Sequence, residues 1–289
     1  MTVESRASTT SRRLVVLAAL CAASCGSPLM KLPSGPGSAV PAQEAAAALT
    51  QATSACRALR TLTAEIAVSG SAGGHRLRGR LSAGVSAPAS ARLEAVAPFG
   101  PPLFIFVATG EDATLLLPRD QRVLEHGRAD AVLDAVAGVP LGAADLEATL
   151  TGCTAPLGAD AQTRQFGDTW QQLTRASADE IYLQRDAAGQ PWRLAASIRR
   201  VAGGRAWRTE YRDHQNGLPR TIRVTSIDAR EGGRTPGTAF DLQMVLSQVE
   251  TNVPLGADAF TIQAPASSTP ISLEELRRSG PLAPKAHER

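Results

Sequence analysis

The segment RLEAVAPFGPPLFIFVATGEDATLLLPRDQRVLEHGRADAVLDAVAGVPLGAADLEATLTGC, residues 92–153, contains the change of periodicity that decides the fold. Its first part holds short apolar runs separated by turn residues, as β-strands do, at 92–96, 103–108, 113–117 and 122–125. Its second part places apolar residues three or four apart at 129–139 and 141–150, and these runs end near Gly138 and Gly152. The segment therefore predicts antiparallel strands followed by two short helices.

The sequence on both sides of this segment continues the strand pattern. An Ala-rich stretch at 42–62 has helical spacing, and an alternating hairpin follows at 62–68 and 77–81 with Arg76, Arg78 and Arg80 on its wet face. After residue 153, turn sequences separate further strand-like runs at 169–173, 181–183, 192–198, 206–212, 221–227 and 240–246. A meander of about ten strands must curl or split into two packed sheets. We expect a mainly β protein whose helices can fill the concave face of the sheet.

The N-terminus has the features of an export signal. Arg12 and Arg13 precede a short apolar run at 14–23, so residues 1–24 are expected to be a signal peptide, exported by the general or the twin-arginine route. Small residues directly before Cys25 are typical of a bacterial lipobox, which predicts lipidation of Cys25; cleavage nearby without lipidation is the alternative. The Pro-, Gly- and Ser-rich residues 25–41 would then be a lipidated tether. Residues 42–265 would form the folded domain and 266–289 a polar tail with a short helical signal at 272–278.

The charge of the chain excludes one class of partner. The net charge is +3, and the basic residues, nearly all arginine, are spread along the sequence, so nucleic-acid binding is not expected. Removal of residues 1–24 takes away three arginines and one glutamate, which leaves +1. We therefore expect the acyl anchor, and not the overall charge, to hold the protein at the membrane.

No catalytic arrangement is visible in the sequence. The four histidines, His75, His126, His214 and His287, are scattered and share no metal-ligand spacing with one another or with a cysteine. No nucleophile elbow and no phosphate-binding glycine loop are present. We expect no enzyme activity, no metal and no cofactor. Cys56 and Cys153 would reach an oxidising compartment, where they either form a disulfide or stay as two buried thiols.

The order of elements and three short motifs resemble the LolA/LolB family of lipoprotein carriers, and most of all its outer-membrane lipoprotein LolB. The motifs are Ala97-Pro98-Phe99-Gly100, Gly138-Val139-Pro140-Leu141 and the helix that ends at Gly152. The apex residue Phe99 departs from the usual leucine. The resemblance implies a half-open antiparallel barrel of about ten or eleven strands, with an N-terminal helix and the mid-chain helix pair covering or plugging its concave face.

The resemblance also implies a function. An apolar cavity would bind acyl chains of lipoproteins or another lipid, received from a periplasmic LolA-like carrier. The turn Pro98, Phe99 and Gly100 would touch the membrane; alternatively, the turn folds back and Phe99 caps the barrel rim. Gly26 stands where inner-membrane retention usually needs Asp, which implies the outer membrane, facing the periplasm. Candidate cavity residues are Leu77, Leu81, Val96, Phe104, Phe106, Leu115, Leu117, Leu242, Met244 and Leu246.

Two other interpretations stay open at this point. The same apolar residues could pack into a filled barrel, in which case the chain would be a structural or accessory lipoprotein that binds a protein partner. The cavity could also carry a different hydrophobic ligand. An acyl-sized apolar void would favour a carrier, and a packed interior would favour the accessory protein.

Overall fold

The computed structural model describes residues 28–201, 205–227 and 240–279. The described residues from Pro33 onward belong to one compact unit. The predicted signal peptide and Cys25 lie outside the described residues. No helix in the described part of the chain is long and apolar enough to span a membrane.

In the described residues, fifteen strands form a single sheet whose first and last strands do not pair. These are more strands than the sequence predicted, because short strands lie at both edges of the sheet. All neighbours are antiparallel except β15, which lies parallel to β7. The spatial order is β1-β8-β9-β10-β11-β12-β13-β14-β2-β3-β4-β5-β6-β7-β15. The strands are β1 (Ser38–Ala39), β2 (Thr61–Ala72), β3 (His75–Ser86), β4 (Ser90–Val96), β5 (Ile105–Thr109), β6 (Asp112–Leu117), β7 (Arg122–Arg128), β8 (Gln162–Phe166), β9 (Trp170–Thr174), β10 (Glu180–Gln184), β11 (Arg193–Arg200), β12 (Ala206–Arg212), β13 (Thr221–Ile227), β14 (Phe240–Thr251) and β15 (Thr269–Pro270).

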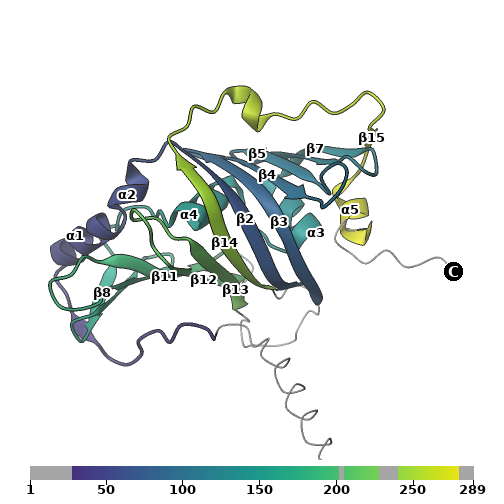
Figure 1. The fold of residues 1–289 in the computed structure, drawn as a ribbon. Helices are drawn as coiled ribbons and strands as arrows, with labels where there is room; N and C mark the ends of the chain where they lie inside the picture. The colour runs from purple at the N-terminus through teal and green to yellow at the C-terminus, as the bar shows by residue number, and fades with distance from the viewer. Residues whose placement is uncertain (1–27, 202–204, 228–239, 280–289) are drawn as a thin grey trace, which may run out of the picture. The chain divides into compact units, whose positions relative to one another are not determined.

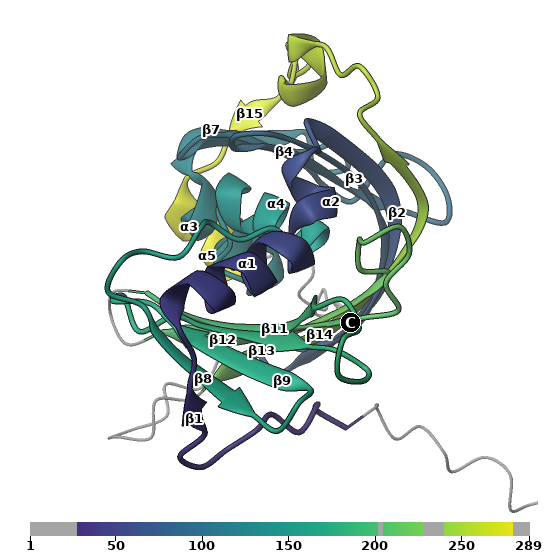
Figure 2. The ribbon, with the colours of Figure 1, turned by 90° about the vertical axis from the view of Figure 1, so that its left-hand side faces the viewer.

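The sheet curls around the helices. Figure 2 shows α1, α3 and α4 enclosed between the part of the sheet that holds β3, β4 and β7 and the part that holds β11, β12 and β13. In β4, and in β2 from Leu62 to Ile66, every second residue is buried, as expected for strands with one face on the core and one face in water. The long strands β14, β2 and β3 lie side by side and connect the two parts of the sheet (Figure 1).

The helices are α1 (Ala42–Ala52), α2 (Ser54–Arg57), α3 (Ala129–Ala137), α4 (Ala143–Thr151) and α5 (Leu273–Ser279), with a 3₁₀ turn at Ala257–Phe260. The stretch predicted as one helix at 42–62 is two helices, because Thr53 interrupts it and donates its hydroxyl to the Leu49 carbonyl at 2.8 Å. The predicted mid-chain helix pair is present as α3 and α4. Each ends at a glycine with positive φ, Gly138 (71°) and Gly152 (69°), a conformation that glycine adopts without strain.

The packed unit extends beyond residue 265, where the sequence placed the start of a polar tail. Ile271 and Leu276 are buried in the core. Ser272 and Glu275 begin α5 with reciprocal hydrogen bonds of 2.9 and 3.2 Å between side chain and backbone. Arg122 donates to the Pro270 carbonyl at 3.1 Å, and β15 pairs with β7. A few apolar residues in a polar stretch are thus enough to attach it to the sheet edge and to α3.

Candidate functional site

An apolar cavity of about 150 Å³ lies between the concave face of the sheet and the helices α3 and α4. The strands β2, β3, β4, β13 and β14 supply one wall, and the two helices with their connection supply the other. Two arginines of β3 are the only charged residues on it. The lining residues are Ile66, Val68, Leu77, Arg78, Gly79, Arg80, Leu81, Leu93, Ala95, Val96, Leu103, Phe104, Leu133, Ala137, Val139, Leu141, Leu146, Leu150, Val224, Leu242 and Met244.

Several positions on the cavity wall hold residues with small or absent side chains, which leaves space between the sheet and the helices. Gly79 lies between Leu77 and Leu81 on the same face of β3, and no atom lies within 4 Å of the position that a Cβ would take there. Ala95 of β4 and Ala137 of α3 also line the void. The hydropathy pattern missed Gly79, because a residue without a side chain gives no apolar signal. A glycine between Leu77 and Leu81 on one face of a strand is the signal that could have identified it.

Six of the ten residues predicted to line a cavity do so: Leu77, Leu81, Val96, Phe104, Leu242 and Met244. Val96 does so at the margin, because it pairs with Arg80 on the opposite face of the sheet and is 44% exposed. The other four are buried and do not line the void: Phe106, Leu115, Leu117 and Leu246. Phe106 and Leu115 pair across β5 and β6, and α3 packs on β6 and β7, so this part of the concave face is closed.

The cavity lies next to the turn that carries Phe99. Strand β4 pairs with β3 only from Arg80 to Ser86, so residues 75–79 of β3 extend past it. Val96 and Leu103, on either side of the turn, both line the cavity. The predicted turn residues Pro98, Phe99 and Gly100 are at its apex, and the Phe99 side chain is 89% exposed, so it does not cap the rim.

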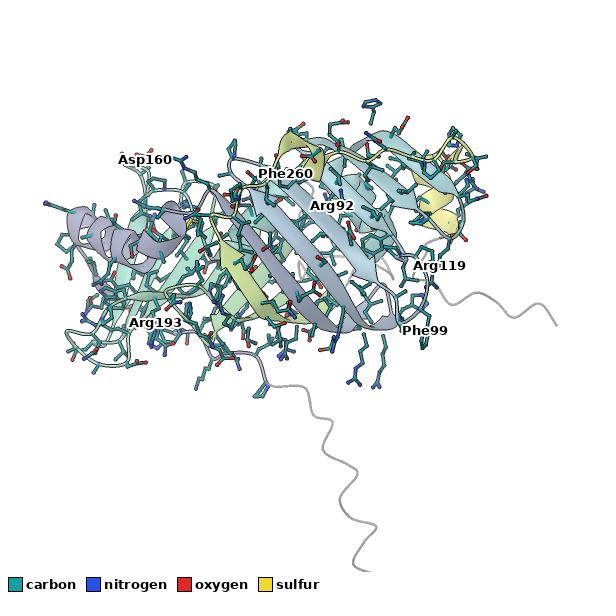
Figure 3. The ribbon with its side chains drawn as sticks, turned by 45° about the horizontal axis from the view of Figure 1, so that its top comes forward. Arg92, Phe99, Arg119, Asp160, Arg193 and Phe260 are labelled. Carbon is teal, nitrogen blue, oxygen red and sulfur yellow. A yellow bond between two sulfur atoms is a disulfide. The ribbon has the colours of Figure 1, made fainter. Side chains whose placement is uncertain are left out.

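Arg119 holds this turn in place, a role that the sequence did not reveal. Its guanidinium donates to the Phe99 carbonyl at 2.8 Å and to the Pro101 carbonyl at 3.2 Å. Figure 3 shows Arg119 beside the turn and Phe99 at the edge of the sheet. Two hydrogen bonds from a charged donor fix the backbone, and Phe99 is left projecting into solvent.

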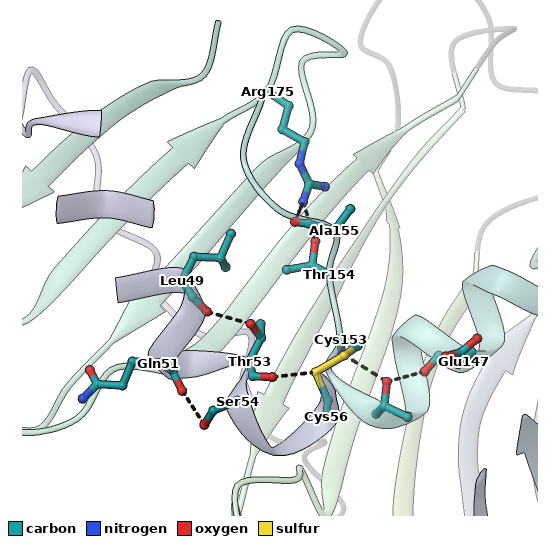
Figure 4. The surroundings of a disulfide bond; sticks show 11 residues. Leu49, Gln51, Thr53, Ser54, Cys56, Glu147, Cys153, Thr154, Ala155 and Arg175 are labelled. Atoms are coloured by element: carbon teal, nitrogen blue, oxygen red, sulfur yellow. Dashed lines mark hydrogen bonds between the residues drawn. A yellow bond between two sulfur atoms is a disulfide. The ribbon is translucent and has the colours of Figure 1, made fainter. Parts of the chain in front are cut away.

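Cys56 and Cys153 form a disulfide, which resolves the alternatives left by the sequence. Their Cα atoms are 5.5 Å apart, within the usual range for a bridge. The bond joins α2 to the residue after Gly152, at the end of α4 (Figure 4). Arg175 holds the next residues by donating to the Thr154 hydroxyl at 2.8 Å and to the Ala155 carbonyl. The helix pair is thus fastened at one end.

Charged and polar groups line a second, smaller cavity. This cavity, of about 60 Å³, lies beside α4 and β10–β12 and contains an ion pair between Arg199 and Asp145 at 3.1 Å. His126 is exposed and lies 3.3 Å from Asp112. In the described part of the chain, no group of three His, Cys, Asp or Glu residues could hold a metal.

No protein-family model and no curated protein matches the sequence. Among solved structures, a LolA superfamily protein from Nitrosomonas europaea matches with a TM-score of 0.50 at 14% identity, over 78% of this chain and 99% of that one. A DUF1329 family protein from Desulfovibrio piger matches at 0.46 and 12% identity, over 74% and 96%. An outer membrane lipoprotein-sorting protein domain from Vibrio parahaemolyticus matches at 0.45 and 11% identity, over 76% and 97%. The chain therefore has the half-open barrel fold of the LolA superfamily, as the motifs at 92–153 implied.

Proposed function

We propose that this protein is an outer-membrane lipoprotein, facing the periplasm, that binds acyl chains of lipoproteins in its cavity and helps to insert them into the membrane. The observation that carries the proposal is the apolar void between the sheet and the helix pair. Acyl chains need apolar surface and no directed hydrogen bonds, and each Å² removed from water contributes about 25 cal/mol. The function requires no catalytic residue, cofactor or metal.

The size of the cavity adds a condition to the proposal. At about 150 Å³ it is smaller than the pockets that hold most ligands, which start near 300 Å³. A long acyl chain would therefore have to displace α3 and α4 from the sheet. Leu133, Leu146 and Leu150 of these helices line the void, so the surface that the helices would present to an acyl chain is apolar.

The remaining parts of the proposal concern the membrane. The acyl anchor on Cys25 would keep the body near the outer membrane, and a soluble periplasmic LolA-like carrier would deliver the cargo. Phe99 would touch the bilayer during insertion, next to the side of the cavity that Val96 and Leu103 line, which we call the cavity mouth. The 89% exposure of Phe99 and the hydrogen bond from Arg119 favour this role.

A second candidate is an accessory lipoprotein that binds a protein partner and carries no lipid. The small volume of the cavity favours it, because an apolar void of this size can stay empty. A carrier of another hydrophobic ligand would use the same cavity and differ only in what it holds.

The proposal can be tested in a strain that lacks the protein. We expect lipoproteins to accumulate in the periplasm or inner membrane, and the wild-type chain to restore their sorting. A Gly79→Leu chain should fail to restore it, since the added side chain enters the void. Gly158→Leu is the matched control, because Gly158 is in a loop, has no atom near its Cβ position and does not line the cavity.

Native mass spectrometry of the same purified variants identifies the ligand. We expect acyl-bearing adducts on the wild type and on Gly158→Leu, and their loss from Gly79→Leu. Normal lipoprotein sorting in the deletion strain would contradict the proposed function. A protein that carries no adduct in any variant would favour the accessory lipoprotein, and a non-acyl adduct would favour the other carrier.

A further inference from the structure

Three arginines form a row on the outer face of the sheet beside the cavity mouth. Arg76, Arg78 and Arg80 alternate along β3 with Leu77, Gly79 and Leu81, so their side chains share the opposite face of the strand, and Arg78 and Arg80, like Val96, border the cavity at its margin. All three are exposed. Arg76 and Arg80 are four residues apart in sequence, which is about 13 Å along a strand. The row therefore places three positive charges within a short distance.

This row lacks carboxylate partners in the part of the chain that the structure describes, because none of the three arginines forms an ion pair there. Two of the three nearby acidic residues of this face are held by other arginines. Asp241 is bound by Arg223 at 2.6 and 2.7 Å, and Glu94 by Arg92 at 2.6 Å. Glu65, the third, lies opposite Ser82, two residues along β3 from Arg80, and forms no ion pair among the described residues, so one negative charge stands beside three positive ones. The local charge is therefore positive although the net charge of the chain is close to zero.

Exposed apolar side chains surround the same row. Val96, 44% exposed, pairs directly with Arg80, and Val245, 42% exposed, pairs with Ala67, the other neighbour of Arg80. Phe99 follows Val96 in the turn. Of the four large apolar side chains that are exposed in the described residues, three are thus gathered here. Cations next to projecting apolar groups are the combination that binds the interface of an anionic bilayer.

We infer that Arg76, Arg78 and Arg80, with Val96, Phe99 and Val245, form a docking surface for anionic phospholipid headgroups. This inference deepens the proposed function and rests on it for the cargo. The acyl anchor holds the protein at the membrane without setting its orientation. The arginine row sets it, because headgroup contacts on this surface turn the mouth between β3 and the Phe99 turn towards the bilayer.

The test is vesicle binding by a soluble form that begins at Gly26, which keeps every described residue of the core. Vesicles contain phosphatidylcholine alone or phosphatidylcholine with phosphatidylglycerol. One arginine near an anionic surface changes affinity by a factor of about five, so the triple Arg→Gln variant at 76, 78 and 80 should bind the anionic vesicles on the order of a hundredfold more weakly. Salt should weaken the wild type in the same direction.

The matched control is a triple Arg→Gln variant at Arg57, Arg60 and Arg164, which are exposed on α2, before β2 and on β8. It should change binding by less than about twofold, since these side chains are outside the docking surface.

Equal loss in both triple variants, or no loss in the first, would overturn the inference. So would loss of cargo transfer with vesicle binding intact, which would assign the row to an acidic protein partner. Acyl adducts in native spectra should persist in the first variant, so that failure of this inference is distinguishable from failure of the proposed function.

Discussion

The concave face of the sheet holds its large apolar cavity under α3 and α4, whereas the region under α1 borders only the smaller cavity of about 60 Å³ beside β10–β12. In the region under α1, the α1 half, helix α1 packs on β8, β10 and β11 over the buried residues Leu173, Ile181 and Leu183. In the other region, the cavity half, α3 and α4 cover β2, β3, β4, β13 and β14 and leave a void of about 150 Å³. One continuous sheet therefore supports a more closely packed region and a region with a larger apolar void.

Side-chain size explains the difference. The three tryptophans and two tyrosines of the chain all lie between residues 170 and 211, and Trp192, Trp207 and Tyr211 are buried there. Phe104 is the only aromatic residue that lines the cavity. Both regions are apolar, so hydrophobicity does not distinguish them. The volume supplied at each position does, because a protein interior leaves a void wherever large side chains are missing.

Removal of the disulfide should have the largest effect, because the bond ties α2 to the end of α4 and so adds a covalent link between the two regions. The bond closes a segment with a sequence separation of 97 residues, and a loop of that length is expected to contribute about 4 kcal/mol to the free energy of unfolding. A Cys56→Ala/Cys153→Ala variant, followed by urea unfolding, measures it. The wild type treated with reductant should lose the same amount of stability relative to the oxidised wild type. Equal stability of the oxidised wild type, the reduced wild type and the double variant would show that the bond is not needed to hold α4.

Truncation of one leucine in each region should sharpen the comparison. Leu173→Ala in the α1 half should cost about 3 kcal/mol, because it creates a new cavity in a filled core. Leu77→Ala in the cavity half should cost about 1 kcal/mol, because Leu77 is only partly buried and borders an existing void. Urea midpoints at constant m-value measure both. A loss as large for Leu77 as for Leu173 would mean that the cavity half is packed.

Much of the fold was predictable from local signals. Apolar periodicity located most strands, and Gly138 and Gly152 marked the ends of the helix pair. The edge strands β1 and β15 are two residues each, too short to show a period. The tail was interpreted as polar because its attachment depends on Ile271 and Leu276, two residues in a long stretch.

The site was predictable in part, for a physical reason. Alternation assigns a residue to a face but not to a void, so it could not separate Leu77, which lines the cavity, from Phe106 and Leu115, which pack under α3. Sequence spacing could not decide whether Cys56 and Cys153 meet, because their distance depends on how α2 and α4 are placed. Phe99 was found because an aromatic residue at a Pro/Gly apex has no local partner.

The smallest effect we expect is an opposite response of the two regions to acid. Burial and the nearby Arg193 lower the pKa of His214, which follows β12 in the α1 half. Unfolded His214 titrates near 6.5, so the unfolded state binds more protons below that pH and the α1 half should become less stable as pH falls. Burial raises the pKa of Asp134 on α3 and of Glu147 on α4, so these carboxyls favour the folded state increasingly as pH falls through their folded pKa values.

Amide hydrogen exchange, corrected for the intrinsic effect of pH on the rate, can follow both regions between pH about 8 and about 4, which spans the ordinary pKa values of histidine and of the carboxyls. Residues around His214 should lose protection on acidification, while α3 and α4 should gain it. His214→Gln should remove the first response and leave the second, and Asp134→Asn combined with Glu147→Gln should do the reverse. If the two regions lost protection together in every variant, the disulfide and the shared sheet would couple them into one cooperative unit. Displacement of α3 and α4 by a ligand would then have to disturb the α1 half as well.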